Sequence, residues 1–550
     1  MLKKIQLLDC TLRDGAYIVN GDFGDAIIKG VLANLVSAKI DIIECGWLKD
    51  SPYKNGSVYY NKPSDLSRLL PASQNSAPIY TAMIDWDRYT LENLPEHGPQ
   101  TIDAIRMVFP HGKHEDALAL APKIISKGYS LYLQAANTLA YSDAELSSLA
   151  KAINRSNAKA VSIVDTFGAM YPNDLKRIFN RLDADLEDDI RIGFHSHNNQ
   201  QLSFALTMEF IRLGMNSKRG LIVDSSLCGM GRGAGNAPTE LVVNWINKQY
   251  HGNYDLNFIL DAIDHYIATL KQQNEWGYST PYFIAGIHCC HVNNIAYLIT
   301  HHKTRAMDMQ LIIESLPPSD RVKYDYGKLE QAFVDYSNNQ VDDSDELNKL
   351  SAILGERPVL LLCPGTTLAK EEDRIRNAIK TINPMVIGVN SVPEQFECDW
   401  YFFTSAARLS VSSALYGNKL SGKTVVITSN ISTPESASAL KINFNRLAKR
   451  GWMHFDNSTI MCLRLLAKLN CKRIYCAGFD GLAENEESSY ADNVMQANLP
   501  IEVKKSINDD VIDMLNDFIT ANEGRINLAF VTTSLYDKKL KLERNDKNGK

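Results

Sequence analysis

The chain has 550 residues, of which 45% are hydrophobic and 22% are charged, and its formal net charge is -6. This length exceeds what one hydrophobic core usually supports, so we expect two or more domains. The mixed charge indicates no surface for nucleic acid, and no apolar run is long enough to span a bilayer. Because Asp9 and Arg13 interrupt the N-terminal apolar run, we expect no secretory signal and a cytoplasmic protein.

Short apolar runs alternate with amphipathic stretches over the first 250 residues, which predicts repeated strand-helix units with parallel crossovers. The predicted strands are residues 6–8, 41–45, 79–83, 104–108, 130–134, 160–164, 190–194 and 221–223. The predicted helices between them include residues 23–37, 115–127, 142–154, 173–182 and 199–213. Eight such units match a (β/α)8 TIM barrel, with a doubly wound sheet as the alternative.

A His-x-His pattern follows the seventh predicted strand, at His195 and His197. Residues two apart in an extended chain point the same way, so these imidazoles can bind one ion. The candidate carboxylate is Asp14, near the end of the first strand. A hard carboxylate beside imidazoles favours Mn, Fe, Co, Mg or catalytic Zn over a thiolate zinc site. By itself a His-x-His pattern is as often two polar residues at a strand end, and the barrel order is what favours a metal site.

Functional groups of TIM barrels lie at the carboxyl ends of the strands. A barrel would place a further set of polar residues at these ends. They are Arg13, Glu44, Gln134, Asp165, Thr166 and Asp224.

Four segments occur in an order that resembles a known superfamily, the metal-dependent TIM barrels of pyruvate aldolases and acyl-transfer enzymes. They are TLRDG at 11–15, DTFGAM at 165–170, HSHNN at 195–199 and GMGRGAGNAPTE at 229–240. The superfamily includes 4-hydroxy-2-oxovalerate aldolase, HMG-CoA lyase, isopropylmalate and homocitrate synthases, and the carboxyltransferase domain of pyruvate carboxylase. The resemblance covers residues 1 to about 300, and the short glycine segment is most similar to the hydroxy-oxovalerate aldolases.

The resemblance implies a divalent ion, with Mn expected before Mg, Co or Zn, held by Asp14, His195 and His197. It would polarise the keto oxygen of a 2-oxo acid as an enolate forms. Arg13 would donate to that oxygen or to the carboxylate, for which a planar guanidinium is suited. The glycines of the 229–240 segment serve either ligand contact or backbone conformation alone.

The resemblance, for Asn236, and the strand-end positions, for Gln134, Asp165 and Thr166, predict the residues of substrate binding and support. Asn236 would support the metal or its loop, and Thr166 would offer a hydroxyl at the barrel mouth. The predicted substrate-binding set is Gln134, Asp165, Thr166 and Asn236.

One departure from the aldolases concerns proton transfer. Their Arg-Asp-Gly motif is shortly followed by a His, whereas this chain continues Gly15-Ala16-Tyr17. Tyr17 and Tyr278 are the candidate proton donors, with packing as the alternative role for each. Glu44 joins Arg13 in the predicted catalytic set, unless the two residues merely pair with each other.

The remaining chain predicts helices after residue 250 and a second domain. We expect the barrel over 1–300, a helical extension and linker over 301–355, and a Rossmann-like α/β domain over 356–550. Its predicted strands are residues 357–362, 385–389, 400–403, 424–428, 473–477 and 527–531. Residues 359–368, 388–390, 457–462 and 474–481 weakly resemble bacterial sialyltransferase-like folds, which implies a nucleotide or nucleotide sugar. A structural domain fits this half equally well.

The predicted function is a metal-dependent aldolase, a carbon-carbon lyase acting on a 4-hydroxy-2-oxo acid with pyruvate enolate as intermediate. Its small-molecule partners would be a 2-oxo acid and an aldehyde, and self-association stays open. One alternative is Claisen-type transfer from acyl-CoA to a 2-oxo acid. Another is a non-catalytic barrel with a nucleotide-sugar-binding second domain. The ten cysteines lack CxxC spacing, so we expect reduced thiols.

Overall fold

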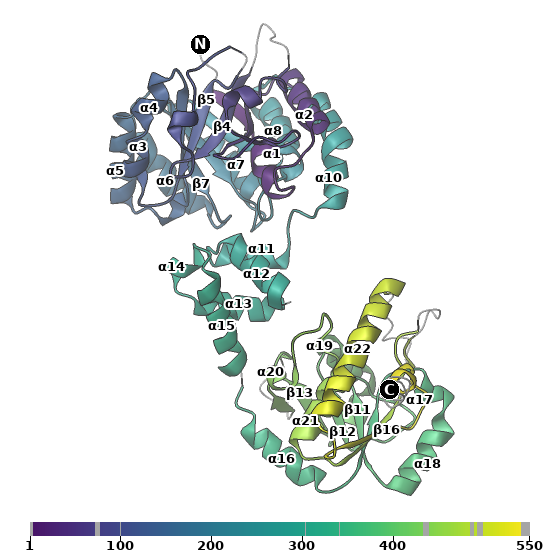
Figure 1. Ribbon diagram of the computed structural model, residues 1–550. Coiled ribbons are helices and arrows are strands. Elements are labelled where there is room, and N and C mark those ends of the chain that lie inside the picture. The colour runs from purple at the N-terminus through teal and green to yellow at the C-terminus, as the bar shows by residue number, and fades with distance from the viewer. Residues whose placement is uncertain are drawn as a thin grey trace. The chain divides into compact units, whose positions relative to one another are not determined.

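The structure is a computed structural model with two units. It describes residues 4–71, 78–99, 101–302, 304–339, 341–432, 439–483, 489–491 and 499–540. Internal contacts divide the chain into Met1–Ala332 and Phe333–Lys550, and each unit contains its own parallel sheet (Figure 1). The finer limits at residues 300 and 355 stay predictions.

Eight parallel strands close into a barrel in the first unit. Their order is β1-β9-β8-β7-β6-β5-β4-β2, and β1 also pairs with β2, which closes the sheet. The strands are β1 (Ile5–Asp9), β2 (Ile42–Leu48), β4 (Ile79–Asp85), β5 (Ala104–Phe109), β6 (Ser130–Ala135), β7 (Ala160–Asp165), β8 (Arg191–Ser196) and β9 (Leu221–Ser225). The predicted TIM barrel is confirmed. A short strand absent from the prediction, β3 (Tyr59–Tyr60), pairs with β2.

Helices connect the barrel strands, as the amphipathic stretches predict. They are α2 (Asp25–Ser37), α3 (His114–Leu118), α4 (Ala121–Ser126), α5 (Asp143–Asn154), α6 (Pro172–Asp185), α7 (Ser203–Met215) and α8 (Thr239–Tyr250). The single helix predicted over 115–127 is wrong, because the chain forms two short helices there. Helix α5 begins with a capping box, in which the Ser142 side chain accepts from the Glu145 amide.

Two layers of apolar side chains hold the barrel together. The strands are almost wholly buried because helices cover them outside and side chains fill them inside, so they appear as continuous apolar runs. An inner layer combines Leu8, Ile42, Tyr132 and Ile222 from different strands. The packed interior leaves polar chemistry to the carboxyl ends of the strands.

Short helical elements follow β1 and extend the first unit after the barrel. A single turn, α1 (Thr11–Asp14), and the 3-10 turn Gly15–Tyr17 lie directly after β1. The later helices are α9 (Leu256–Ala262), α10 (Ala268–Gln273), α11 (Thr280–Ile287), α12 (Val292–His302), α13 (Ala306–Ser315), α14 (Pro318–Arg321) and α15 (Tyr326–Asn339). No described helix combines the length and the apolar composition that a membrane crossing needs.

The second unit is an open parallel sheet with helices, as the Rossmann-like prediction expects. Its order is β14-β13-β12-β11-β10-β15-β16. The strands are β10 (Val359–Leu362), β11 (Met385–Val389), β12 (Trp400–Phe403), β13 (Thr424–Thr428), β14 (Leu440–Ile442), β15 (Arg473–Ala477) and β16 (Asn527–Phe530). The helices are α16 (Ser344–Leu354), α17 (Thr367–Lys370), α18 (Glu372–Ile382), α19 (Ala406–Leu420), α20 (Phe444–Leu447), α21 (Ser458–Lys468) and α22 (Ile501–Ala521). Only β14 is missing from the predicted strands.

Candidate metal and substrate site

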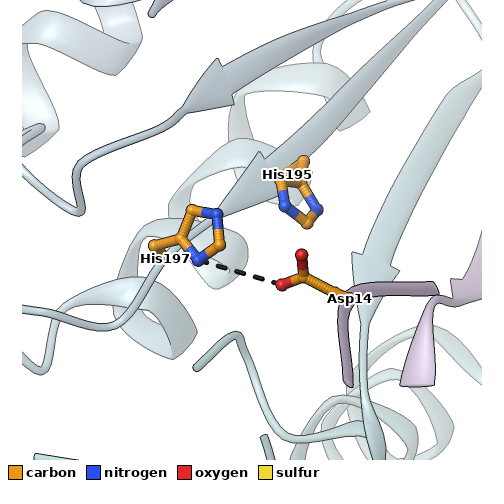
Figure 2. A group of neighbouring side chains, drawn as sticks. All are labelled: Asp14, His195 and His197. Atoms are coloured by element: carbon orange, nitrogen blue, oxygen red, sulfur yellow. Dashed lines mark ion pairs between the residues drawn. The ribbon is translucent and has the colours of Figure 1, made fainter. Parts of the chain in front are cut away.

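Three predicted metal ligands come together at the carboxyl end of the barrel. Asp14 ends α1, His195 lies in β8, and His197 follows that strand. One ligand atom of each lies within 4.8 Å of the others, and all three side chains are buried. Figure 2 shows the carboxylate directed toward the two imidazoles. This Asp-His-His cluster could bind a metal ion.

An unpaired buried nitrogen of His197 and the protonation states of His197 and Asp14 fit a metal ion at this cluster. His197 Nδ1 lies 3.9 Å from Asp14 Oδ2 and, among the described residues, has no hydrogen-bond partner. Burial lowers the pKa of His197 to about 4, so the imidazole is neutral near pH 7. Burial opposes ionisation of Asp14, but the charges of Arg13, His197 and His195 outweigh it and hold the pKa of that carboxyl well below its usual range. These are the deprotonated forms that a metal binds.

A chain of alternating charges connects Asp14 to His195 through the barrel. Arg13 contacts Asp14 Oδ1 through Nη1 at 2.6 Å and Glu44 Oε2 through Nε at 2.7 Å. Arg106 then joins the same Glu44 oxygen at 2.8 Å to Asp224 Oδ2 at 2.5 Å. Every group is nearly fully buried, and each charge contacts one of opposite sign.

Asp224 determines which nitrogen of His195 is available to an ion. Its Oδ2 lies 3.1 Å from His195 Nδ1, so Nε2 is the nitrogen left for coordination. Burial opposes ionisation of Asp224, but Arg106 and His195 lower its pKa overall. The carboxylate can therefore hold the imidazole in one orientation.

The glycine segment predicted at 229–240 supports Asp14 from the opposite side. Asn236 Nδ2 donates to Asp14 Oδ2 at 2.6 Å. A Cβ on Gly231 would lie 2.3 Å from that nitrogen and 2.5 Å from that oxygen, so a side chain there would separate them. At Gly235 the φ angle is +82°, and a Cβ would lie 1.9 Å from the Gly229 carbonyl. The segment thus serves both backbone conformation and a close approach to Asp14.

Three predicted substrate-binding residues bond to the protein itself. Gln134 Nε2 donates to Ser162 Oγ at 2.9 Å, and Thr166 Oγ1 accepts from the Asn137 amide at 2.7 Å. Asp165 accepts from the Ala169 and Met170 amides. Burial raises the pKa of Asp165 to about 7. These contacts build the barrel mouth, and substrate contact by the three residues stays a prediction.

The two candidate proton donors differ in their surroundings. The Tyr17 ring packs edge-on against Trp47 at 6.2 Å, and the Arg232 guanidinium lies 5.0 Å from its centre. Desolvation raises the pKa of Tyr17 to about 12, although 43% of the residue is exposed. Tyr278 lies between α10 and α11 and is 58% exposed. Only Tyr17 is adjacent in sequence to the cluster.

Two residues near the site, Arg106 and His291, were not among the predicted site residues. Arg106 is the only charged side chain in β5, and a charge inside a buried apolar strand could have identified it. His291 had no such signal, because it precedes α12, far along the chain. Its Nε2 lies 2.6 Å from the Arg232 guanidinium, and burial lowers its pKa to about 3. The helical extension therefore contacts the glycine segment beside Tyr17.

The fold and site define a (β/α)8 barrel with a buried Asp-His-His cluster. Residues 116–265, which lie within the barrel unit, match the HMGL-like family model. Oxaloacetate decarboxylase of Mycobacterium tuberculosis is 26% identical over 264 residues, covering 46% of this chain and 74% of that relative. 4-Hydroxy-2-oxovalerate aldolase of Carboxydothermus hydrogenoformans is 29% identical over 283 residues, covering 49% and 78%.

A solved structure also resembles this chain. It is the N-terminal domain of a protein from Bacteroides vulgatus, provisionally named an aldolase. The two are 27% identical, with a TM-score of 0.48, and the match covers 54% of this chain and 97% of that one. The resemblance of the second unit to sialyltransferase-like folds has no support in these comparisons.

Proposed function

We propose that the barrel is a divalent-metal-dependent aldolase, which cleaves or forms a carbon-carbon bond of a 4-hydroxy-2-oxo acid with pyruvate enolate as intermediate. The buried cluster of Asp14, His195 and His197 carries this proposal. Relatives named 4-hydroxy-2-oxovalerate aldolase, at 25–29% identity, support it. A divalent ion held there, Mn²⁺ by expectation or else Mg, Co or Zn, would supply Lewis-acid polarisation of the keto oxygen.

Arg13 is the proposed binding group for the 2-oxo acid. Its contacts with described residues use Nε and Nη1, which leaves Nη2 as a donor. That nitrogen would donate to the keto oxygen or the carboxylate and stabilise the developing negative charge. Glu44 is a positioning residue in this scheme, because it holds Nε of Arg13 at 2.7 Å.

Tyr17 is the proposed proton donor. With a pKa of about 12 the phenol stays protonated near neutral pH. Its hydroxyl would deliver a proton to the methylene carbon of the enolate, which yields the methyl group of pyruvate. Tyr278 is the second candidate for this step.

Oxaloacetate decarboxylation is a second candidate reaction, favoured by the relative of that name. Loss of carbon dioxide from oxaloacetate leaves the same enolate of pyruvate, so Arg13 and Tyr17 would serve both reactions. Both reactions break the bond between C3 and C4. They differ in the fragment that leaves, which is carbon dioxide from oxaloacetate and an aldehyde from the hydroxy-oxo acid, and only the aldol cleavage also needs a base that takes the proton of the C4 hydroxyl. Oxaloacetate is therefore a required arm of the test.

The test measures pyruvate release from a panel of 4-hydroxy-2-oxo acids and from oxaloacetate, with Mn²⁺ or with chelator. We expect metal-dependent turnover that Asp14→Asn lowers by about 100-fold or more. Thiol release from acetyl-CoA with a 2-oxo acid would instead indicate Claisen-type transfer. Metal binding without turnover on any substrate would indicate a non-catalytic barrel and overturn the proposal.

Three further properties remain predictions from the sequence. They are a cytoplasmic location, self-association, and a nucleotide or nucleotide sugar at the second unit.

A further inference from the structure

A cavity of about 180 Å³ lies in the second unit at the carboxyl ends of β10, β11 and β15. The strand order changes direction here, because β11 to β14 follow on one side of β10 and β15 and β16 lie on the other. In open α/β sheets the connections at such a point leave toward opposite faces and open a crevice that ligands use. The position of the cavity therefore indicates a binding site.

Two glycine turns form one wall of this cavity. The Gly365 amide donates to the Gly478 carbonyl at 2.9 Å, which brings the turns after β10 and β15 together. A Cβ on Gly365 would lie 2.4 Å from that carbonyl oxygen, and one on Gly478 would lie 2.0 Å from the Cys363 oxygen. A side chain at either position would push the turns apart.

Neutral polar groups line the cavity at its other side. Asn457 caps α21 through its Oδ1, which accepts from the Thr459 and Ile460 amides, so its Nδ2 is the donor left for the cavity. The Ser489 hydroxyl is buried and, among the described residues, has no hydrogen-bond partner. Asn390 is 7% exposed and holds the wall in place, because its Oδ1 accepts from the Thr404 amide at 2.9 Å and its Nδ2 donates to the Ser458 and Thr404 hydroxyls. Such groups match the hydroxyls of a sugar.

A cation in the described lining of the cavity offers a binding group for an anion. Among the described residues, this lining contains one cation, Arg408, and one carboxylate, Asp480. Asp480 bonds to the Thr367 amide at 2.8 Å and the Thr367 hydroxyl at 2.5 Å, so its charge is engaged by the turn. The Arg408 guanidinium lies over the Tyr490 ring at 4.7 Å, and its planar donors suit a phosphate.

We propose that this cavity binds a phosphorylated polyol, with Arg408 at the phosphate and Asn457 at a sugar hydroxyl. A sugar phosphate and a nucleoside monophosphate share this chemistry. A second hollow of about 320 Å³ shares Pro364 with the cavity and gives room for a further group. The site lies wholly within the second unit and does not depend on the reaction of the barrel.

Calorimetric titration of the full chain with ribose 5-phosphate, AMP and CMP tests the proposal. Ribose and inorganic phosphate, titrated separately, are the controls for the sugar and for the phosphate. We expect one of the phosphorylated ligands to bind saturably and more tightly than either control. A gain from AMP or CMP over ribose 5-phosphate would identify a nucleotide, and its absence a sugar phosphate. Binding of none at millimolar concentrations, or of inorganic phosphate equally well, would overturn the proposal.

Two variants locate the binding. Arg408→Met should weaken it at least about tenfold, whereas Arg473→Met, an exposed cation at the start of β15, should not. Asn457→Asp keeps the helix cap but replaces the amide donor by a carboxylate, so it should weaken binding at unchanged Tm. Asp14→Asn in the barrel should leave it unchanged. An unaltered Kd in both cavity variants, or loss in the Asp14 variant, would assign the ligand elsewhere.

Discussion

At the residue scale, the Asp14 carboxylate belongs to the candidate metal cluster and also contacts the side chains that hold it in place. It faces His197 at 3.9 Å and accepts from Asn236 at 2.6 Å, and Arg13 contacts its other oxygen. Asparagine has nearly the same volume but no charge. The carboxylate is thus the group whose charge a metal would need.

Asp14→Asn should therefore lose metal while the barrel stays folded. We expect Mn²⁺ affinity to fall by about 100-fold or more, because a ligand contributes at least as much as its outer-shell partners. Calorimetric titration with Mn²⁺ measures the affinity, and far-UV circular dichroism checks the fold. Unchanged affinity would remove Asp14 from the site.

Arg106 should matter for stability even though it lies outside the cluster. Arg106→Met leaves the Glu44 and Asp224 carboxylates buried without their shared cation. Breaking a buried ion pair from one side costs about 3–5 kcal/mol, so we expect that loss in the free energy of unfolding.

A denaturant titration of the barrel measures this loss. The matched control is Arg212→Met on α7, whose ion pair with Glu209 is at the surface, where solvent screens it, and should contribute little to stability. An equal loss in the free energy of unfolding for the two substitutions would contradict a stabilising role of the buried Arg106 ion pairs.

Asp165 predicts a pH dependence of stability. Burial raises its pKa to about 7, above the unfolded value of 3.8, so the folded state binds the proton more tightly. Its contribution favours folding below pH 4 and is lost as pH rises through 7. Asp165→Asn should thus gain Tm relative to the native chain between pH 5 and pH 8. A Tm difference that is constant over this range would show that the carboxyl is already ionised.

At the element scale, the 229–240 segment brings backbone and side chains against Asp14. Gly231→Ala places a methyl group 2.3 Å from Asn236 Nδ2 and 2.5 Å from Asp14 Oδ2. We expect it to displace this pair and to weaken Mn²⁺ binding by about 10–100-fold. The control is Gly98→Ala, where a Cβ would meet nothing within 4 Å. Similar metal affinities in the two variants would show that Gly231 has no steric role.

Periodicity predicted most elements because the strands are buried on both faces and appear as uninterrupted apolar runs. It failed where elements are too short for a pattern. Strand β3 has two residues and β14 has three, and the stretch 115–127 divides into α3 and α4. In these segments pairing and packing with distant residues decide the structure.

At the scale of the whole molecule, two separate cores account for the two units. The barrel core draws on β1 to α10, and the cores of the second unit draw on residues from Leu350 to Leu540. A cut after residue 340, between α15 and α16, should leave residues 1–340 folded. We expect this fragment to bind Mn²⁺ and release pyruvate like the full chain.

Thermal unfolding and the pyruvate assay on the fragment check this expectation. A fragment that unfolds would show that the barrel needs the second unit for stability. A folded fragment without turnover would show that the second unit takes part in the reaction.

The sequence by itself determined the barrel and the three candidate metal ligands, because strand spacing and the His195/His197 alternation are local patterns. It could not reveal that Arg106 bridges Glu44 and Asp224, or that His291 contacts Arg232. Those contacts join residues 59 to 118 positions apart. Only closure of the barrel and packing of the helical extension bring them within bonding distance, because such proximity depends on the whole sheet.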